Sequence, residues 1–249
     1  VYDGERLIGR SGGMDPEGRV DPWSYFVNAY VLDRKGQRIN RRNGQDIFVP
    51  LYDHQIPPGA ADVVHYRMTL PDNIVGPVSI EVRLKYRKFD TEYLQHIQGD
   101  KFNGNRLPVT TMASDRIVLP VVNGLTIDTD TGSSIPEWER WNDYGIGLLR
   151  EGNSGSSKGE LRQAEQVFKR VEAINPGQGA LNLARVYFKE GRLDEASAAI
   201  HRASQTTPPA PPWTLAWFSA RIDHENGHLD NAIESLERIY DNQFETAAA

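Results

Sequence analysis

The chain contains no cysteine. This absence excludes disulfide bonds, thiolate metal sites, a cysteine nucleophile and covalent attachment of haem c within the chain itself. Apolar runs are short, so we expect no segment that spans a membrane. The net charge of -6 and the shortness of the basic clusters do not favour nucleic-acid binding. Because the sequence starts at Val1 without a methionine or an apolar signal segment, we expect a processed or partial chain.

The first half of the sequence has the alternation typical of β-strands. In "VSIEVRLKY" (78–86), apolar and polar residues alternate without interruption, as in a half-buried antiparallel strand. "SYFVNAYVLD", "DIFVPLYDH", "DVVHYRMTL" and "DRIVLPVV" are further candidate strands, separated by turns rich in proline and glycine. We therefore predict a lead-in segment over 1–20, an all-β sandwich of the immunoglobulin-like kind over 21–124, and a linker over 125–137.

From Trp138 onward the apolar period becomes helical, and three segments resemble one another. Ala164, Ala196 and Ala232 recur at close to the roughly 34-residue period of tetratricopeptide repeats. The middle segment resembles such a repeat most closely, through Leu183, Ala184, Tyr187, Gly191, Ala196, Ile200, Ala203 and Pro208. This resemblance implies an all-α helical array over 138–244, with repeats at about 138–176, 177–208 and 213–244. The first repeat departs from the pattern through an insertion at 152–160.

The string "HENGH" (224–228) fits H-E-x-x-H, in which two histidines on one helix bind zinc beside a glutamate base. A zinc hydrolase using His224, Glu225 and His228 is therefore one hypothesis. In the repeat register, however, Gly227 falls at the turn between two helices. Because the metal motif needs both histidines on one continuous helix, the sequence favours a surface turn with no metal and a non-enzymatic protein.

The first helix of each repeat lines the concave face in tetratricopeptide arrays, and the resemblance therefore suggests which residues contact a partner. Six polar residues are candidates for holding a peptide or a protein through amide and charge-assisted hydrogen bonds. They are Asn142, Arg150, Asn182, Arg185, Lys189 and Arg221. The alternative interpretation is that these residues are solvated polar positions of helix surfaces.

A second resemblance covers nearly all of the chain and rests on 21–71, "VRLKYRKFD" (82–90) and "LPV" (107–109). These stretches are similar to the region after the haem-binding part of bacterial multihaem c-type cytochromes that also carry tetratricopeptide repeats. The resemblance implies a role in electron transfer and a periplasmic or extracellular location. Since C-x-x-C-H is missing here, haem c would lie on an absent segment or a partner chain. His54 is then a candidate axial ligand to that neighbouring haem.

Taken together, these patterns predict a non-enzymatic interaction scaffold, the accessory C-terminal part of a multihaem cytochrome assembly. Its partner would be a peptide or protein on the concave face, a cytochrome segment, or further copies of the chain. The alternative is a stand-alone peptide- or carbohydrate-binding protein. Carbohydrate binding would use exposed aromatic rings as stacking platforms, for which Trp23, Tyr25, Tyr30 and Tyr52 are the candidates.

Overall fold

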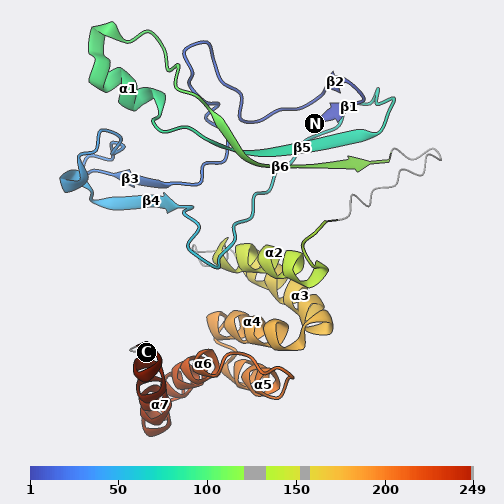
Figure 1. Cartoon of the computed structure of the whole chain (residues 1–249), viewed down its shortest axis with the longest axis vertical. Helices are drawn as coiled ribbons and strands as arrows, with labels where there is room; N and C mark the ends of the chain where they lie inside the picture. The colour runs from blue at the N-terminus through green and yellow to red at the C-terminus, as the bar shows by residue number, and fades with distance from the viewer. Residues whose placement is uncertain (121–132, 152–157, 248–249) are drawn as a thin grey trace. The chain divides into compact units, whose positions relative to one another are not determined.

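A computed structural model describes residues 1–120, 133–151 and 158–247 (Figure 1). The chain forms two compact units, and neither is a single continuous stretch of sequence. The N-terminal unit comprises Val1–Gln55 and Val64–Ser133, whereas the helical unit comprises Ile56–Val63 and Ser134–Ala249. The predicted linker at 125–137 and the insertion at 152–160 lie largely outside the described residues.

The N-terminal unit contains a four-stranded antiparallel sheet in the order β2-β1-β5-β6. Strand β1 (Tyr2–Asp3) pairs with β2 (Arg6–Leu7) and with β5 (Val78–Tyr86), so the first residues of the predicted lead-in segment belong to the sheet. Strand β6 (Thr110–Leu119) completes the sheet by pairing along β5. The strand predicted over 78–86 is confirmed.

A second sheet of the same unit pairs β3 (Ala29–Leu32) with β4 (Val49–Asp53), and the 3₁₀ turn η1 (Gly44–Asp46) lies between them. Helix α1 (Thr91–Gln98) follows β5 and is capped by Asp90, whose side chain accepts a hydrogen bond from the Tyr93 amide; the short η2 (Gly99–Lys101) comes next. The expected strand over 62–70 does not form, because these residues pair with no other strand in the described part of the chain.

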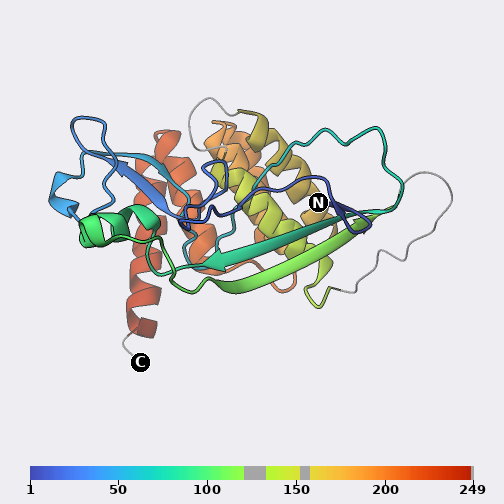
Figure 2. The ribbon, with the colours of Figure 1, turned by 90° about the horizontal axis from the view of Figure 1, so that it is seen from above.

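The helical unit consists of consecutive helices that pack as neighbours along the chain (Figure 2). Three pairs correspond to the predicted repeats: α2 (Glu137–Glu151) with α3 (Lys158–Ile174), α4 (Pro176–Lys189) with α5 (Leu193–Ser204), and α6 (Pro212–Glu225) with α7 (Leu229–Ala247). The predicted fold class, a β domain followed by an array of paired helices, is confirmed. None of the described helices is long and apolar enough to cross a membrane.

The core of the helical unit combines large apolar side chains with small residues that let helices approach closely. Phe168 is 0% exposed and fills the space beside Gly145, where an added Cβ would lie 2.5 Å from the Phe168 ring. Ala164, Ala184 and Ala196 are also completely buried. The small and large positions that define the predicted repeat therefore serve packing between helices.

Candidate partner-binding site

Two of the six candidate residues, Asn142 and Asn182, link the first helices of adjacent repeats. The Asn182 side chain on α4 donates from Nδ2 to Oδ1 of Asn142 on α2 over 2.6 Å. Its own Oδ1 accepts a hydrogen bond of 2.9 Å from Nη1 of Arg185. Because Asn182 is only 1% exposed, it orients Asn142 and Arg185 and offers little surface of its own to a partner.

Three cations follow this amide pair along α4 and α6. Lys189 donates from Nζ to the carbonyl of Leu149 at the end of α2 over 3.2 Å. The guanidinium of Arg221 on α6 lies 4.3 Å from the ring centre of Phe188 on α4. A second contact has the cation on α4 and the ring on α6, since the guanidinium of Arg185 lies 5.4 Å from the ring centre of Phe218. We call Arg185, Lys189 and Arg221 the cation row.

The side of α4 that carries Arg185 faces away from α3. Tyr187 reaches α3, since its hydroxyl donates to Glu165 over 3.3 Å. Arg185 lies two positions earlier, about 200° around the helix from Tyr187 at 3.6 residues per turn. Asn182 on α4 contacts α2 through Asn142, and Phe188 on α4 contacts α6 through Arg221. The cation row therefore lies where the first helices of neighbouring repeats meet. This is the side that the repeat pattern predicted to be the concave, partner-facing one.

The cation row has no anionic partner within the described residues. By contrast, Arg192, at the turn before α5, contacts the carboxylates of Glu165, Glu190 and Glu195, and these contacts raise its pKa. Burial lowers the pKa of Arg185. Partial desolvation, and secondly the charge of Arg221, lower the pKa of Lys189. A carboxylate bound to the row would offset the cost of this desolvation and the repulsion between Lys189 and Arg221, so the row is suited to an anionic ligand.

Arg150 differs from the other candidates, because its Nη1 donates to the carbonyl of Ala61 over 2.9 Å. Phe188 and Phe218 are contact residues that the sequence reasoning missed. The sequence does contain a pattern that indicates them. Phe188 lies three positions from Arg185, and Phe218 lies three positions from Arg221, a spacing that places two side chains on the same face of a helix.

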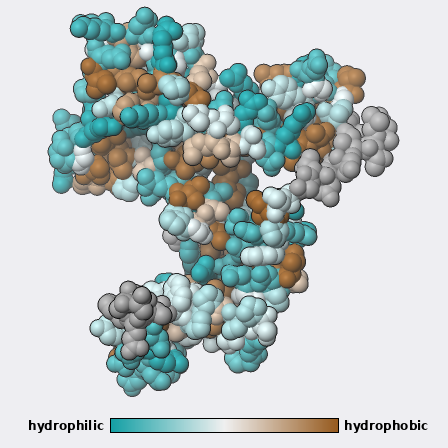
Figure 3. Space-filling view, viewed as in Figure 1, coloured by the Kyte–Doolittle hydropathy of each residue, from teal (hydrophilic) through white to brown (hydrophobic). Residues whose placement is uncertain are grey.

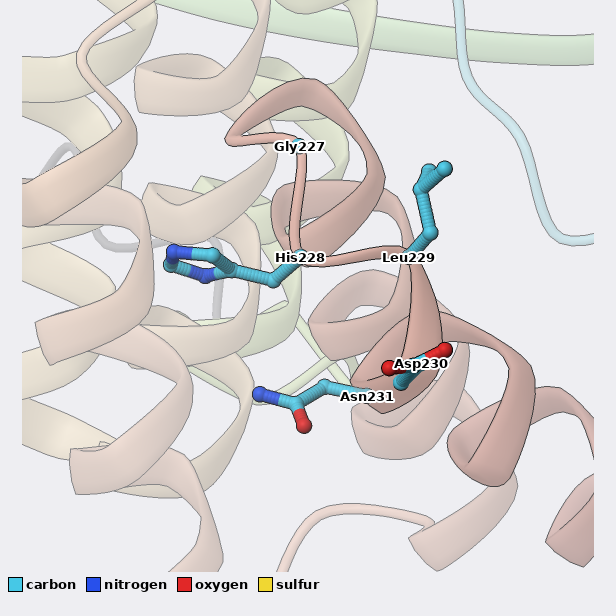
Figure 4. A pocket seen from close by; sticks show the side chains of 5 residues that line it. All are labelled: Gly227, His228, Leu229, Asp230 and Asn231. Carbon is cyan, nitrogen blue, oxygen red and sulfur yellow. The ribbon is translucent and has the colours of Figure 1, made fainter.

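The HENGH segment does not form one helix. Helix α6 ends at Glu225, Gly227 has a φ of 80°, and α7 begins at Leu229, so a turn separates His224 from His228. An open depression of about 280 Å³ follows this turn, and within it His228 and Asn231 point to one side while Leu229 points to the other (Figure 4). Within the ranges that the structure describes, no group of three or more His, Asp or Glu side chains is arranged to hold a metal ion.

The remaining candidates lie in the N-terminal unit. The imidazole of His54 is stacked between Tyr25, at a ring distance of 4.7 Å, and Tyr52, at 4.4 Å. Tyr52 also contacts Tyr30, so three of the four proposed carbohydrate platforms are engaged with neighbouring rings. Trp23 is 86% exposed and is the one of the four that presents most of its surface.

Comparisons with known proteins agree with the helical repeat pattern. No curated protein and no solved structure matches the chain. The family model described as "Tetratricopeptide repeat" matches residues 157–216, which correspond to α3, α4, α5 and the beginning of α6. This match, the paired helices and the small residues at their contacts show that 157–216 is similar to tetratricopeptide repeats and that the helical unit has the arrangement of such an array.

Proposed function

We propose that the protein is a non-enzymatic interaction scaffold whose helical array binds an acidic segment of a protein partner on the side formed by α4 and α6. Tetratricopeptide arrays are in general interaction modules, which supports the scaffold role. The observation that carries the finer proposal is the cation row, whose three charges lack carboxylate partners in the described chain.

The chemistry of the row favours an extended chain of carboxylates over other ligands. A guanidinium binds a carboxylate through two parallel hydrogen bonds, whereas the Lys189 ammonium provides a point charge. Phe188 and Phe218 hold Arg221 and Arg185 by cation–π contacts, which reduces the side-chain entropy lost when a partner binds. An acidic peptide crossing α4 and α6 would meet all three cations.

A fluorescein-labelled octaglutamate peptide is the probe that tests this function, with octalysine as the charge control. We expect octaglutamate to bind, and we expect Lys189→Ala/Arg221→Ala to weaken its affinity by about tenfold or more through loss of two charge-assisted contacts. The matched control is Arg140→Ala/Arg162→Ala, which removes the same charge from exposed positions of α2 and α3. Equal binding by the two double variants, or no binding of octaglutamate by the native protein, would contradict the proposal.

A second candidate role is that of the accessory part of a multihaem cytochrome assembly in a periplasmic or extracellular location. The observation that favours it is His54, whose ring is held between two tyrosine rings and forms no side-chain hydrogen bond to any described residue. An imidazole held in this way suits an axial ligand to iron in a neighbouring chain or segment. Haem chemistry would then belong entirely to that neighbour, since this chain has no cysteine.

The absorbance spectrum of the protein from its natural source tests this second role. A Soret band that co-purifies with the chain, and whose low-spin character is lost in His54→Ala, is the expected result. A colourless preparation with the mass of this chain alone would remove the cytochrome role and leave the scaffold function untouched.

A further inference from the structure

Residues Ile56–Val63, "IPPGAADV", belong to the helical unit although the chain on both sides of them belongs to the N-terminal unit. We call this segment the strap. Val63 is 9% exposed and forms part of the core cluster of the helical unit. The Ala61 carbonyl accepts the hydrogen bond of Arg150 from α2. The contacts that hold the strap thus include an apolar one at Val63 and a polar one at Ala61.

The strap lies on the side of α2 that faces away from α3. A Cβ added to Gly147 would lie 2.5 Å from Cγ2 of Val63 and 3.0 Å from the carbonyl carbon of Asp62. A Cβ added to Gly145 would instead meet Phe168 of α3. The two glycines are about 200° apart around the helix. Gly147 therefore provides a niche for the strap backbone on the side that corresponds to the partner-facing side of α4.

The composition of the strap suits an extended bound chain. Pro57 and Pro58 have fixed φ angles, which lowers the entropy lost on docking. The Ala60 amide donates to the Pro57 carbonyl over 3.0 Å, which forms a turn just before the docked residues. Ala60 and Ala61 are small enough to let the backbone come close to α2.

We propose that the strap is an intramolecular ligand of the array, resident in the Gly147 niche and held by Arg150. The strap covers the partner-facing side of α2. The surface that an external partner contacts, which we call the footprint, therefore comprises α4 and α6 and excludes α2. The docking of the strap stands independently, whereas the position of the footprint rests on the proposed acidic-peptide function.

The absence of native cysteine allows a direct test of docking in the full chain. In Val63→Cys/Gly147→Cys, the two side chains are expected to form a disulfide under mild oxidation, because their Cβ atoms come close enough for one. The matched control is Val64→Cys/Gly147→Cys, which uses the neighbouring residue, 40% exposed. Disulfide formation in the first pair alone supports the proposal. If the disulfide forms equally in both pairs, or does not form in the first pair, the proposed docking of the strap is wrong.

A second measurement avoids any change in the niche. Asp-N protease cleaves before Asp62 only when the strap is released. We expect Arg150→Ala to be cleaved about tenfold faster than the native chain, since loss of a charge-assisted hydrogen bond favours release. Arg140→Ala, on an exposed position of the same helix, is expected to match the native rate. Cleavage of the native chain as fast as that of Arg150→Ala would overturn docking.

Octaglutamate binding to Arg150→Ala tests the footprint separately. We expect its affinity to stay within about twofold of the native value, because Arg150 is engaged with the strap. A loss as large as that of Lys189→Ala/Arg221→Ala would place Arg150 in the footprint and overturn this part of the inference. If octaglutamate does not bind the native chain, the proposed function fails together with the footprint, whereas the disulfide and protease results still decide docking.

Discussion

At the scale of single residues, glycines set how closely the first helices approach their neighbours. Gly179 in the first turn of α4 lies against the end of α3. An added Cβ there would come within 2.2 Å of Cα of Glu172, closer than any real contact. Unlike Gly145, which faces a side chain, Gly179 faces backbone that cannot turn away. This position therefore requires glycine for packing although its φ is ordinary.

We expect Gly179→Ala to lower the free energy of unfolding by about 1–3 kcal/mol, because overpacking outweighs the gain of up to about 1 kcal/mol in helix propensity. Urea unfolding followed by circular dichroism measures this change. Gly44→Ala is the control, since a Cβ there meets nothing within 4 Å, and its effect should stay within about 0.5 kcal/mol. A neutral Gly179→Ala would show that α3 and α4 can separate without cost.

At the scale of elements, a network around Glu165 joins the two adjacent repeats. Glu165 on α3 contacts Lys169 of the same helix, the Tyr187 hydroxyl on α4 and Arg192 at the turn before α5. Burial acts to raise the pKa of Glu165, but the hydrogen bonds from Lys169 and Arg192 outweigh it, so that pKa lies below its ordinary value of 4.5. The ionised carboxylate therefore stabilises the contact between repeats.

The depressed pKa of Glu165 predicts acid sensitivity. Its contribution is fully present above pH 4.5 and is lost as the pH falls through the lower pKa of the folded state. We expect the thermal midpoint to fall as the pH drops below 4.5, and to fall less steeply in Glu165→Gln, which has no carboxyl to titrate there. Calorimetry across this range measures both slopes. Parallel curves for the two proteins would assign the acid sensitivity to other carboxylates.

At the scale of the whole molecule, the two units differ in how much apolar surface they bury. Most of the completely buried side chains belong to the helical unit, among them Phe168, Leu148 and Leu183. In the N-terminal unit, β5 and β6 expose apolar side chains, including Val82 and Met112, and apolar residues are visible at its surface in Figure 3. Because burial of apolar surface is the main favourable contribution to folding, the helical unit should be the more stable one.

We accordingly expect the N-terminal unit to unfold at a lower urea concentration than the helical unit. Hydrogen exchange read by mass spectrometry at increasing urea should show loss of protection in β5 and β6 before α3 and α4. Exchange of the two sets of amides at the same urea concentration would show that the units unfold together.

The sequence by itself determined that a β domain is followed by an array of paired helices, and it determined most of the helical repeat. The alternation at 78–86 predicted the strand, but it did not predict its burial, because Val82 and Leu84 are exposed. The recurrence of Ala164, Ala196 and Ala232 predicted buried positions, and all three are buried. The repeat register also predicted a turn at Gly227, and with it the separation of His224 from His228. These predictions depend on neighbours in sequence or on a fixed period, and either can be read from one chain.

Only the tertiary structure decided which segments come into contact when they are distant in the sequence and are not linked by a repeating pattern. The pairing of β1 with β5, the stacking of Tyr25 on His54, and the cation–π contacts between α4 and α6 depend on where the chain returns in space. The strap is the clearest case, because "IPPGAADV" reads as a turn between two strands. Its docking depends on Gly147 and Arg150, which lie more than eighty residues further along the chain, and on the absence of a Cβ that leaves the niche open.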